Sequence, residues 1–319
     1  MTDKIKLSIV IVNWNAYDLL RQCLNSFLFN GFNDYLEVII VDNGSTDGSV
    51  EKIKKEFPCV MVLENSSNMG FARANNQAIK VAGGEYILLL NSDTMIQHGR
   101  IFEKWVKFMD LHPEAAASGC RLIFPDGSHQ VGDAGFKPSL STVMNHCFFL
   151  SRAFPCFFKG LFLSYGRLKN VIEVDWVSGA ALLIRKSVLS KVGLLDEGTF
   201  MFAEDIEWGC RVKALGYKIF YLPCLEIVHL QGGSSKRQSE QAIFSFLWLE
   251  NLRRLYFFYH KNQPTIFYDL IMHSGFLLRC FIYYVGFLIK SDRRMKVKSE
   301  KMFNYFKYRT RELRDINVR

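Results

Sequence analysis

The first 125 residues alternate between short apolar runs and segments with helical periodicity. The apolar runs have the length of strands and lie at 6–12, 36–41, 60–63, 85–90 and 115–122. The helical segments lie between them, at 17–29, 47–57, 72–81 and 99–111. Strands that alternate with helices form βαβ units, which assemble into a mostly parallel sheet flanked by helices. The chain is therefore predicted to be an α/β protein with a doubly wound sheet.

The middle of the chain adds further elements to this plan. Residues 124–135 contain Pro-Asp-Gly and several glycines, which is typical of a turn or hairpin. Residues 136–170 are aromatic and irregular, and they are a candidate cover over a site. Strand pairing is expected to resume at 171–184, followed by a helix at 204–215 and a strand at 218–222.

Charge divides the chain at about residue 235. Residues 236–319 carry 17 Lys and Arg against 7 Asp and Glu, a net charge of +10, whereas the whole chain carries +9. Residues 1–235 are therefore close to neutral, and the pattern after Ser239 is helical. This asymmetry predicts two domains, one over 1–235 and a basic, aromatic helical tail over 236–319 that meets an anionic surface.

The tail contains an apolar, aromatic stretch at 266–289. A basic cluster follows it directly, at Lys290, Arg293, Arg294, Lys296 and Lys298. Asp269, His273 and Arg279 interrupt the stretch, and a charge at the centre of a bilayer is costly. The pattern favours binding in the plane of an anionic membrane over a spanning helix, although an ordinary helix packed on the protein body remains an alternative. No nucleic-acid-binding module is evident.

The cysteines and the N-terminus indicate a cytoplasmic protein. Eight cysteines are scattered without Cys-x-x-Cys spacing, which argues against a zinc cluster or a disulfide framework and suits a reducing compartment. The start, MTDKIKLSIVIVNWN, lacks the apolar region and cleavage site of a signal peptide.

Four polar clusters follow predicted strands. They are Asn13-Trp14-Asn15, the run from Asp42 to Asp47, the run from Asn68 to Asn76, and Asn91-Ser92-Asp93. In a doubly wound sheet these strand ends meet along one crevice. Turn or helix-cap chemistry explains each cluster singly, and Asn91-Ser92-Asp93 would then cap a helix that starts near Gln97. Four clusters in register favour a binding site.

The side chains in these clusters suit a nucleoside diphosphate. Asp42 can accept the imide N–H of uracil or thymine. Gly70 permits close backbone approach, the helix start after it offers N–H groups to phosphate, and Arg73 adds a bidentate contact. Asp93 can hold Mg²⁺ or Mn²⁺ between two phosphates. The chain has neither a P-loop nor GxGxxG after the first strand, so ATP hydrolysis and NAD chemistry lose support.

The second half supplies candidate reactive groups. Glu204 and Asp205 form a carboxylate pair at a predicted helix start, where the helix dipole alone also favours acidic residues. Asp205 is the candidate general base on an acceptor hydroxyl, and Trp208 lies on the same helix face. His229 precedes a glycine pair and is a candidate ligand for the same cation as Asp93, although a lone His is usually structural.

The segment Trp176-Val177-Ser178-Gly179-Ala180-Ala181 is the candidate contact for a sugar ring. Its tryptophan offers an aromatic platform and its glycine permits a tight backbone approach. Plain core packing explains the same residues equally well.

Together these segments resemble glycosyltransferase family 2, the inverting enzymes of the GT-A fold. The matching segments are SIVIVNWN, VIIVDNGSTDGS, NMGFARANNQAI, GEYILLLNSD, WVSGAALLIRKSV, MFAEDIEWGCRVKALGYKIFYLP and IVHLQGGSS. They span about residues 7 to 235 and leave the tail uncovered. Within the family, VNWN, the Asn-Ser-Asp version and AEDIEW are most similar to bacterial rhamnosyltransferase-like members.

The resemblance implies roles for individual residues. The expected nucleotide-binding set, including the residues argued above, is Asn13, Asp42, Asn43, Gly70, Arg73, Asn91 and Ser92. Asp93 matches the last Asp of the DxD metal motif, and His229 matches a metal-binding histidine of some members. Asn91 replaces the first Asp of that motif, which leaves a strict metal requirement open. Asp205 matches the base of the ED motif, and the expected sugar-binding set is Trp176, Ser178, Gly179, Glu204 and Trp208.

The implied reaction is a single in-line displacement with inversion, in which Asp205 takes the proton of the attacking hydroxyl. The expected donor is dTDP-rhamnose, with UDP-galactofuranose, a UDP-hexose or a GDP-sugar as alternatives. The expected acceptor is a saccharide on undecaprenyl diphosphate at the cytoplasmic leaflet, in O-antigen or capsule assembly.

Two other classes of protein share the doubly wound sheet. A sugar nucleotidyltransferase needs a basic, glycine-rich loop after the first strand, where this chain has Asn13-Trp14-Asn15-Ala16. A catalytically inactive binding protein of the same fold is disfavoured by the presence of Asp93 and Asp205. This alternative stays open because Asn91 replaces the first Asp of the metal motif.

Overall fold

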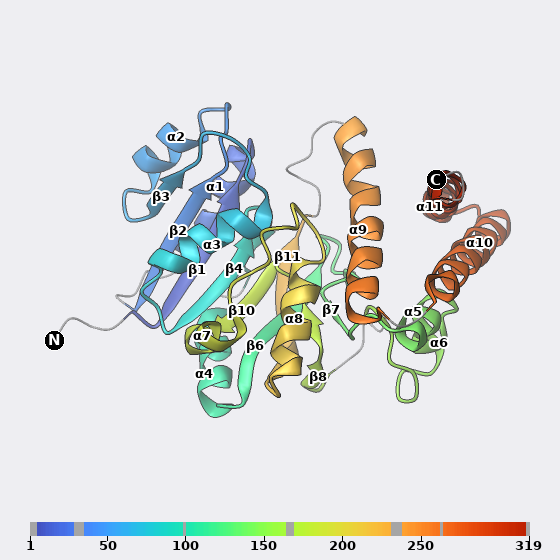
Figure 1. Ribbon diagram of the computed structural model, residues 1–319. Helices are drawn as coiled ribbons and strands as arrows, with labels where there is room; N and C mark the ends of the chain where they lie inside the picture. The colour runs from blue at the N-terminus through green and yellow to red at the C-terminus, as the bar shows by residue number, and fades with distance from the viewer. Residues whose placement is uncertain are drawn as a thin grey trace. The chain divides into compact units, whose positions relative to one another are not determined.

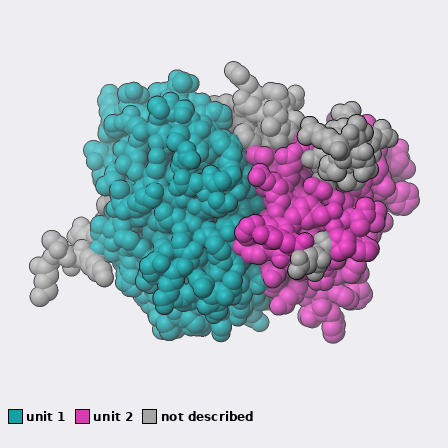
Figure 2. All heavy atoms as spheres, in the orientation of Figure 1, with its two compact units in different colours: residues 1–135, 166–243 teal, residues 136–165, 244–319 magenta. Residues whose placement is uncertain are grey.

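The computed structural model describes residues 5–28, 35–97, 100–163, 169–230, 238–261 and 264–316. The chain forms two compact units, drawn in teal and magenta in Figure 2. The first unit comprises residues 1–135 and 166–243, and the second comprises 136–165 and 244–319. All residues predicted to form the site belong to the first unit.

A nine-stranded mixed sheet forms the centre of the first unit (Figure 1). Its strands are β1 (Leu7–Asn13), β2 (Leu36–Asp42), β3 (Met61–Glu64), β4 (Tyr86–Asn91), β5 (Thr94–Met95), β6 (Ala115–Ile123), β8 (Ile172–Val174), β10 (Ala181–Arg185) and β11 (Lys218–His229). The order is β3-β2-β1-β4-β10-β6-β11-β5, and β8 pairs with β11. Strands β1 to β4 are parallel, as are β6 and β11, whereas β10 runs antiparallel between β4 and β6. The predicted mostly parallel α/β sheet is confirmed.

Helices flank this sheet close to the predicted positions. They are α1 (Tyr17–Leu28), α2 (Ser49–Glu56), α3 (Phe71–Val81), α4 (Ile101–Leu111), α7 (Leu189–Val192) and α8 (Glu204–Ala214). In α1 the apolar side chains Leu20, Leu24 and Phe27 are buried, because their spacing places them on one helix face. They join the strand side chains in a single core. A two-stranded sheet of β7 (Ala134–Gly135) and β9 (Trp176–Val177) completes the unit.

The direction in which successive strands are added to the sheet reverses between β1 and β4. From β1 the chain builds β2 and β3 on one side, and it then adds β4 on the other side of β1. The carboxyl ends of the strands therefore meet in register at this point, where Val12 pairs with Asn91 and Asn13 with Asp42. Open α/β sheets bind ligands at such a switch point.

The helix-cap interpretation of Asn91-Ser92-Asp93 is wrong. The residues that follow are the short strand β5, and α4 begins only at Ile101. The local sequence did not indicate β5, because its pairing partner is the distant end of β11, with Thr94 opposite His229. The strand predicted at 218–222 continues to His229 as β11, with a shift in register between Leu222 and Glu226.

The second unit is helical, as the sequence predicted for the tail. It contains α5 (Leu140–Cys147), α6 (Leu150–Ala153), most of α9 (Gln238–Tyr259), α10 (Thr265–Lys290) and α11 (Arg293–Ile316). Arg279 of α10 donates hydrogen bonds to the carbonyl oxygens of His146 and Cys147. The segment 136–163, predicted as a candidate cover, supplies α5 and α6 to this unit. Within the described part of the chain, α10 is the one helix long and apolar enough to cross a membrane.

Candidate functional site

Asn13 and Asp42 meet at the carboxyl ends of β1 and β2. Asn13 Nδ2 donates to Asp42 Oδ2 at 2.8 Å, and the backbone N–H of Ser45 donates to Asp42 Oδ1 at 2.8 Å. Both side chains are buried. Within the described residues Asn13 Oδ1 has no hydrogen-bond partner, and each Asp42 oxygen keeps a second lone pair. These two side chains therefore present acceptor oxygens, which suit the N–H groups of a pyrimidine base.

Asn43 organises the adjoining loop. Its amide nitrogen donates to Asn68 Oδ1 and to the Gly70 carbonyl, both at 3.2 Å, and its amide oxygen accepts from Asn65 Nδ2 at 2.9 Å. The side chain is 2% exposed. The structure therefore shows Asn43 holding the loop of residues 65–70, and its contact with a nucleoside stays a prediction.

Gly70 makes its close approach to the chain itself. Its φ is +84°, and a Cβ built on it lies 2.6 Å from the carbonyl oxygen of Phe200. The N–H of Phe71, at the start of α3, donates to the same oxygen at 2.9 Å. No pattern in the sequence indicated a role for Phe200. This contact fixes the start of α3 against the segment that leads to Glu204 and Asp205.

Gly70→Ala is expected to destabilise the folded protein by about 3 kcal/mol or more. A side chain at this φ alone costs roughly 1–3 kcal/mol, and the clash with backbone at Phe200 adds to it. Gly127→Ala is the matched control, because Gly127 has φ +77° and nothing lies within 4 Å of a Cβ built there. Urea unfolding of both variants separates strain from clash, and equal losses would contradict the role of the Phe200 contact.

Arg73 pairs with Glu197. Its Nε lies 3.2 Å from Glu197 Oε2, and Asn76 Nδ2 donates to the other oxygen at 3.0 Å. The hydrogen bond from Asn76, and secondarily Arg73, lowers the pKa of Glu197. The Arg73 side chain is 49% exposed, so this ion pair is weak and can be exchanged for a phosphate. The predicted phosphate contact stays a prediction.

Asn91, Asp93 and His229 converge at the end of β4. His229 Nε2 lies 3.1 Å from Asp93 Oδ1 and 3.2 Å from Asn91 Nδ2. Asp93, His229 and the adjacent Ser92 are buried. The β5–β11 pairing produces this arrangement, since it sets Thr94 beside His229 although the two lie far apart in the chain.

Gln130 sets the orientation of the His229 ring. Its Oε1 lies 2.6 Å from His229 Nδ1, and its side chain is 4% exposed. An amide oxygen accepts, so Nδ1 carries a proton, and Nε2 is the ring nitrogen that faces Asp93, where it donates to the carboxylate when protonated and offers a lone pair when neutral. Sequence reasoning missed Gln130, because residues 124–135 show only the signal of a turn.

These residues fit a divalent cation. A lone pair and a carboxylate oxygen that face each other at 3.1 Å repel unless a cation or a proton lies between them. Imidazole nitrogen and carboxylate oxygen are both ligands for Mn²⁺-type ions, and Gln130 is the outer-shell acceptor that a ligating histidine requires. Among the residues that the structure describes, no group of three His, Cys, Asp or Glu gathers to hold a metal. With Asn91 in place of an acid, the remaining ligands have to come from the substrate.

The carboxylate pair at the start of α8 divides into two different groups. Asp205 Oδ2 accepts from the N–H of Gly179 at 3.0 Å, and Oδ1 accepts from the N–H of Ile206 at 2.8 Å. Glu204 is 5% exposed, and its Oε2 has no partner among the described atoms. Burial, and secondarily the charge of Asp205, raises the pKa of Glu204 to about 8; burial also raises the pKa of Asp205. Because the N–H groups of Gly179 and Ile206 donate to Asp205, ionisation is favoured more at Asp205 than at the deeply buried Glu204, and the role of Asp205 as the base stays a prediction.

The wild-type protein is expected to lose stability as the pH rises, because Glu204 must ionise while it is buried. Glu204→Gln is expected to abolish this pH dependence. The folded pKa of Glu204 lies above the unfolded value of about 4.3, so the stability contributed by the protonated carboxyl is complete below that pH and is lost as the pH rises toward 8. Wild type should therefore weaken relative to the variant by up to about 1.4 kcal/mol per pH unit across this window. Denaturant unfolding between about pH 4.3 and pH 8 measures this difference in the free energy of unfolding, with Glu207→Gln as control. If the free energies of unfolding of wild type and Glu204→Gln changed in parallel with pH, Glu204 would not be the protonated group.

The backbone of Gly179 and Ala180 connects Asp205 to the segment that carries Asn91 and Asp93. Gly179 N–H donates to Asp205, while the Ala180 carbonyl accepts from the N–H of Asn91 at 3.0 Å. Asp93 lies two residues beyond Asn91. The structure thus brings Asp205 and Asp93 to the same edge of the sheet, on either side of the start of β10.

The two tryptophans of the predicted sugar-binding set lie in the core. Trp176 is 2% exposed and Trp208 is 1% exposed. The Trp208 indole N–H donates to the Gly193 carbonyl at 3.0 Å, and Gly209 lets α8 pack closely on β9. Neither ring is available to a sugar in this conformation, because both serve the packing of α8. Ser178 is partly buried and its N–H donates to the Asp133 carbonyl at 2.8 Å.

Comparison with known proteins places the chain in a family. The sequence model of Glycosyl transferase family 2 matches residues 8–190. N-acetylglucosaminyl-diphospho-decaprenol L-rhamnosyltransferase of Mycobacterium tuberculosis (strain ATCC 25618 / H37Rv) is 29% identical over 214 residues, which cover 63% of this chain and 69% of that protein. Rhamnosyltransferase WbbL of Escherichia coli (strain K12) is 24% identical over 237 residues, which cover 69% of this chain and 82% of that protein.

A solved structure shares the fold. Mannosyltransferase PcManGT from Pyrobaculum calidifontis, in complex with GDP-Man and Mn²⁺, aligns with a TM-score of 0.60 over 96% of this chain and 86% of its own. At 13% identity this likeness shows the fold alone. Since the family match covers more than half of the residues, the chain belongs to glycosyl transferase family 2 and is a glycosyltransferase of the GT-A fold.

Proposed function

We propose that this protein is an inverting glycosyltransferase that moves L-rhamnose from dTDP-rhamnose to a hydroxyl of a saccharide linked to undecaprenyl diphosphate. The observation that supports the reaction type is the hydrogen bonding of Asp205 to Gly179, next to Ala180, whose carbonyl accepts from the N–H of Asn91, two residues before Asp93. Two relatives named as rhamnosyltransferases support the sugar, and the name of one of them contains a decaprenol-linked diphosphate acceptor.

The chain's own residues divide the work of one displacement. Asn13 and Asp42 accept hydrogen bonds from the base of the nucleotide at the ends of β1 and β2. Asp205 takes the proton of the acceptor hydroxyl as its oxygen attacks the anomeric carbon from the face opposite the diphosphate, and this gives inversion. Asp93 and His229 would hold Mg²⁺ or Mn²⁺, and that ion would supply positive charge to balance the diphosphate.

The protein would work at the cytoplasmic face of the inner membrane as a peripheral protein. Its acceptor carries a lipid, and the basic tail gives the chain an attraction to anionic headgroups. The lipid-linked acceptor and the basic tail therefore both favour a location at the membrane surface.

The decisive experiment is a panel of nucleotide sugars with two readouts. Thermal unfolding is recorded with each compound in the presence of Mg²⁺ or Mn²⁺, and release of nucleoside diphosphate is measured with a polyprenyl-diphosphate-linked saccharide. Only dTDP-rhamnose is expected to raise the unfolding midpoint and to be turned over, because a ligand at about 100 times its Kd stabilises by roughly 2.7 kcal/mol. Turnover of UDP-galactofuranose, a UDP-hexose or a GDP-sugar instead would overturn the choice of donor.

A further inference from the structure

Helix α10 has two apolar faces on opposite sides. The buried face packs within the second unit and includes Tyr268, Met272, Gly275 and Phe276. The opposite face is exposed and includes Ile266, Leu270, Leu277, Phe281, Tyr284 and Leu288. At 3.6 residues per turn these six lie within a sector of about 60° along about 33 Å of helix. Phe281 is 66% and Leu288 61% exposed, so this second face is an apolar stripe that is largely exposed.

Helix α11 runs antiparallel along α10. Ser299 Oγ donates to the Cys280 carbonyl at 2.9 Å, and the rings of Phe276 and Tyr305 lie 5.5 Å apart. A Cβ on Gly286 would lie 2.5 Å from the sulfur of Met295, which shows how closely the helices approach. The two helices therefore form one hairpin over most of the length of α10.

The hairpin is strongly cationic along α11. Between residues 290 and 307 the positive side chains are Lys290, Arg293, Arg294, Lys296, Lys298, Lys301 and Lys307, against Asp292 and Glu300. If α10 crossed a bilayer, the packing would carry several of these cations into hydrocarbon at a cost of several kcal/mol each. An orientation in the membrane plane avoids that cost, since the stripe enters the acyl region while the cations stay among the headgroups.

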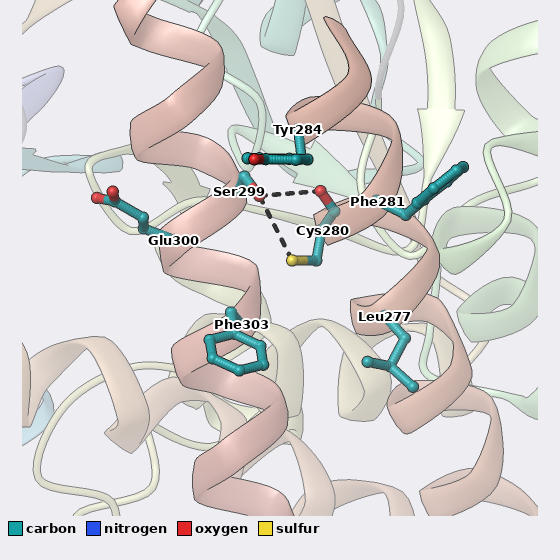
Figure 3. Close-up of a pocket in the computed structure, with 7 residues that line it drawn as sticks. All are labelled: Leu277, Cys280, Phe281, Tyr284, Ser299, Glu300 and Phe303. Carbon is teal, nitrogen blue, oxygen red and sulfur yellow. Dashed lines mark hydrogen bonds between the residues drawn. The ribbon is translucent and has the colours of Figure 1, made fainter. Parts of the chain in front are cut away.

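An apolar groove lies between the two helices (Figure 3). Its volume is about 420 Å³, and its lining residues are Leu277, Cys280, Phe281, Tyr284, Ser299, Glu300 and Phe303. On α11, Lys296 precedes the lining residue Glu300 by four positions and Lys307 follows the lining residue Phe303 by four, so both lysines lie on the same helix face as these residues. Lys307 Nζ lies 4.4 Å from the centre of the Phe303 ring, and Lys296 Nζ lies 5.9 Å from that of Phe287.

We propose that the α10–α11 hairpin lies in the plane of an anionic leaflet and that its groove binds one hydrocarbon chain of an anionic lipid. The apolar lining suits the chain, and the two lysines on the same face of α11 suit a phosphate of the headgroup. A second copy of this hairpin fits less well, because the two cationic rims would face each other. The inference deepens the proposed peripheral location and rests on it.

Co-sedimentation of the full chain with vesicles tests this surface. Wild type is expected to bind vesicles of phosphatidylcholine and phosphatidylglycerol and to bind pure phosphatidylcholine much more weakly. Phe281→Glu and Leu277→Glu should each weaken binding about tenfold or more, because a buried side chain of this size contributes roughly 1.5–3 kcal/mol. Leu111→Glu is the matched control, since Leu111 is 68% exposed on α4 and should have no effect.

Two further measurements identify what binds in the groove between α10 and α11. The double variant Lys296→Ala and Lys307→Ala should weaken the preference for phosphatidylglycerol, and inorganic phosphate should not displace wild type from vesicles. Bound protein should be released by alkaline carbonate, as an in-plane helix is.

Four results would overturn the proposal: equal binding to both vesicles, groove variants that bind like wild type, retention in carbonate, or self-association without lipid that Phe281→Glu abolishes. Thermal protection by nucleotide sugars needs no vesicles, so it reports separately on the proposed reaction.

Discussion

Asp205→Asn is expected to lower kcat by about a thousandfold while the affinity for the nucleotide sugar stays within about twofold. General bases contribute roughly 10²–10⁴ in rate, and the amide keeps the size and one acceptor oxygen of Asp205 but takes up no proton. In Asp205 the N–H groups of Gly179 and Ile206 donate to separate oxygens, so the single amide oxygen of the variant keeps one of these two contacts and loses the other. Release of nucleoside diphosphate gives kcat, and thermal protection by the donor gives binding.

Glu207→Gln is the control for this variant. Glu207 lies on the same helix and pairs with Arg211 at 2.7 Å, away from Gly179. Its turnover should match wild type. If Asp205→Asn also turned over at a near-normal rate, the base would have to be another residue.

Asp93→Asn is expected to weaken binding of Mn²⁺ by at least about a hundredfold in the presence of nucleoside diphosphate. Changes to groups outside the ligand shell already cost 10–100-fold, and Asp93 supplies the only carboxylate that contacts His229 among the described residues. Titration of bound Mn²⁺ by electron paramagnetic resonance measures this affinity without turnover. Turnover should fall in parallel and recover in part at high metal concentration.

Asp126→Asn serves as the control for a lost carboxylate, since Asp126 is exposed in the loop before β7. Its Mn²⁺ affinity should equal that of wild type. An Asp93→Asn variant with unchanged Mn²⁺ binding would remove Asp93 from the cation site.

The order of strands and helices was accessible from the sequence because it depends on local periodicity. Each run from 6–12 to 115–122 became a strand, with ends shifted by about two residues or less. The polar clusters at strand ends also pointed to the correct edge of the sheet, since parallel strands bring their carboxyl ends together. The β5 strand escaped prediction, because two residues carry no period and its partner lies far along the chain.

Individual roles depended on packing that the sequence does not display. Trp176 and Trp208 are of the residue type that stacks against sugar rings, yet the close contact of α8 with β9 buries both in the core. Asn43 sits in a nucleotide-binding cluster, yet its amide is used by the loop of residues 65–70. Gln130 and Phe200 carried no signal, because their partners His229 and Gly70 are distant in sequence.

The sequence by itself determined the α/β class, the edge of the sheet that carries the polar clusters and the basic character of the tail, because each follows from short-range pattern and charge. Only the tertiary structure decided that His229 meets Asp93, that Gly179 holds Asp205, and that α11 keeps its cations along α10. The physical reason is that sheet order and helix packing join segments separated by 15 to 138 residues, as between Trp208 and Gly193 or Asn91 and His229. No local preference specifies such a pairing.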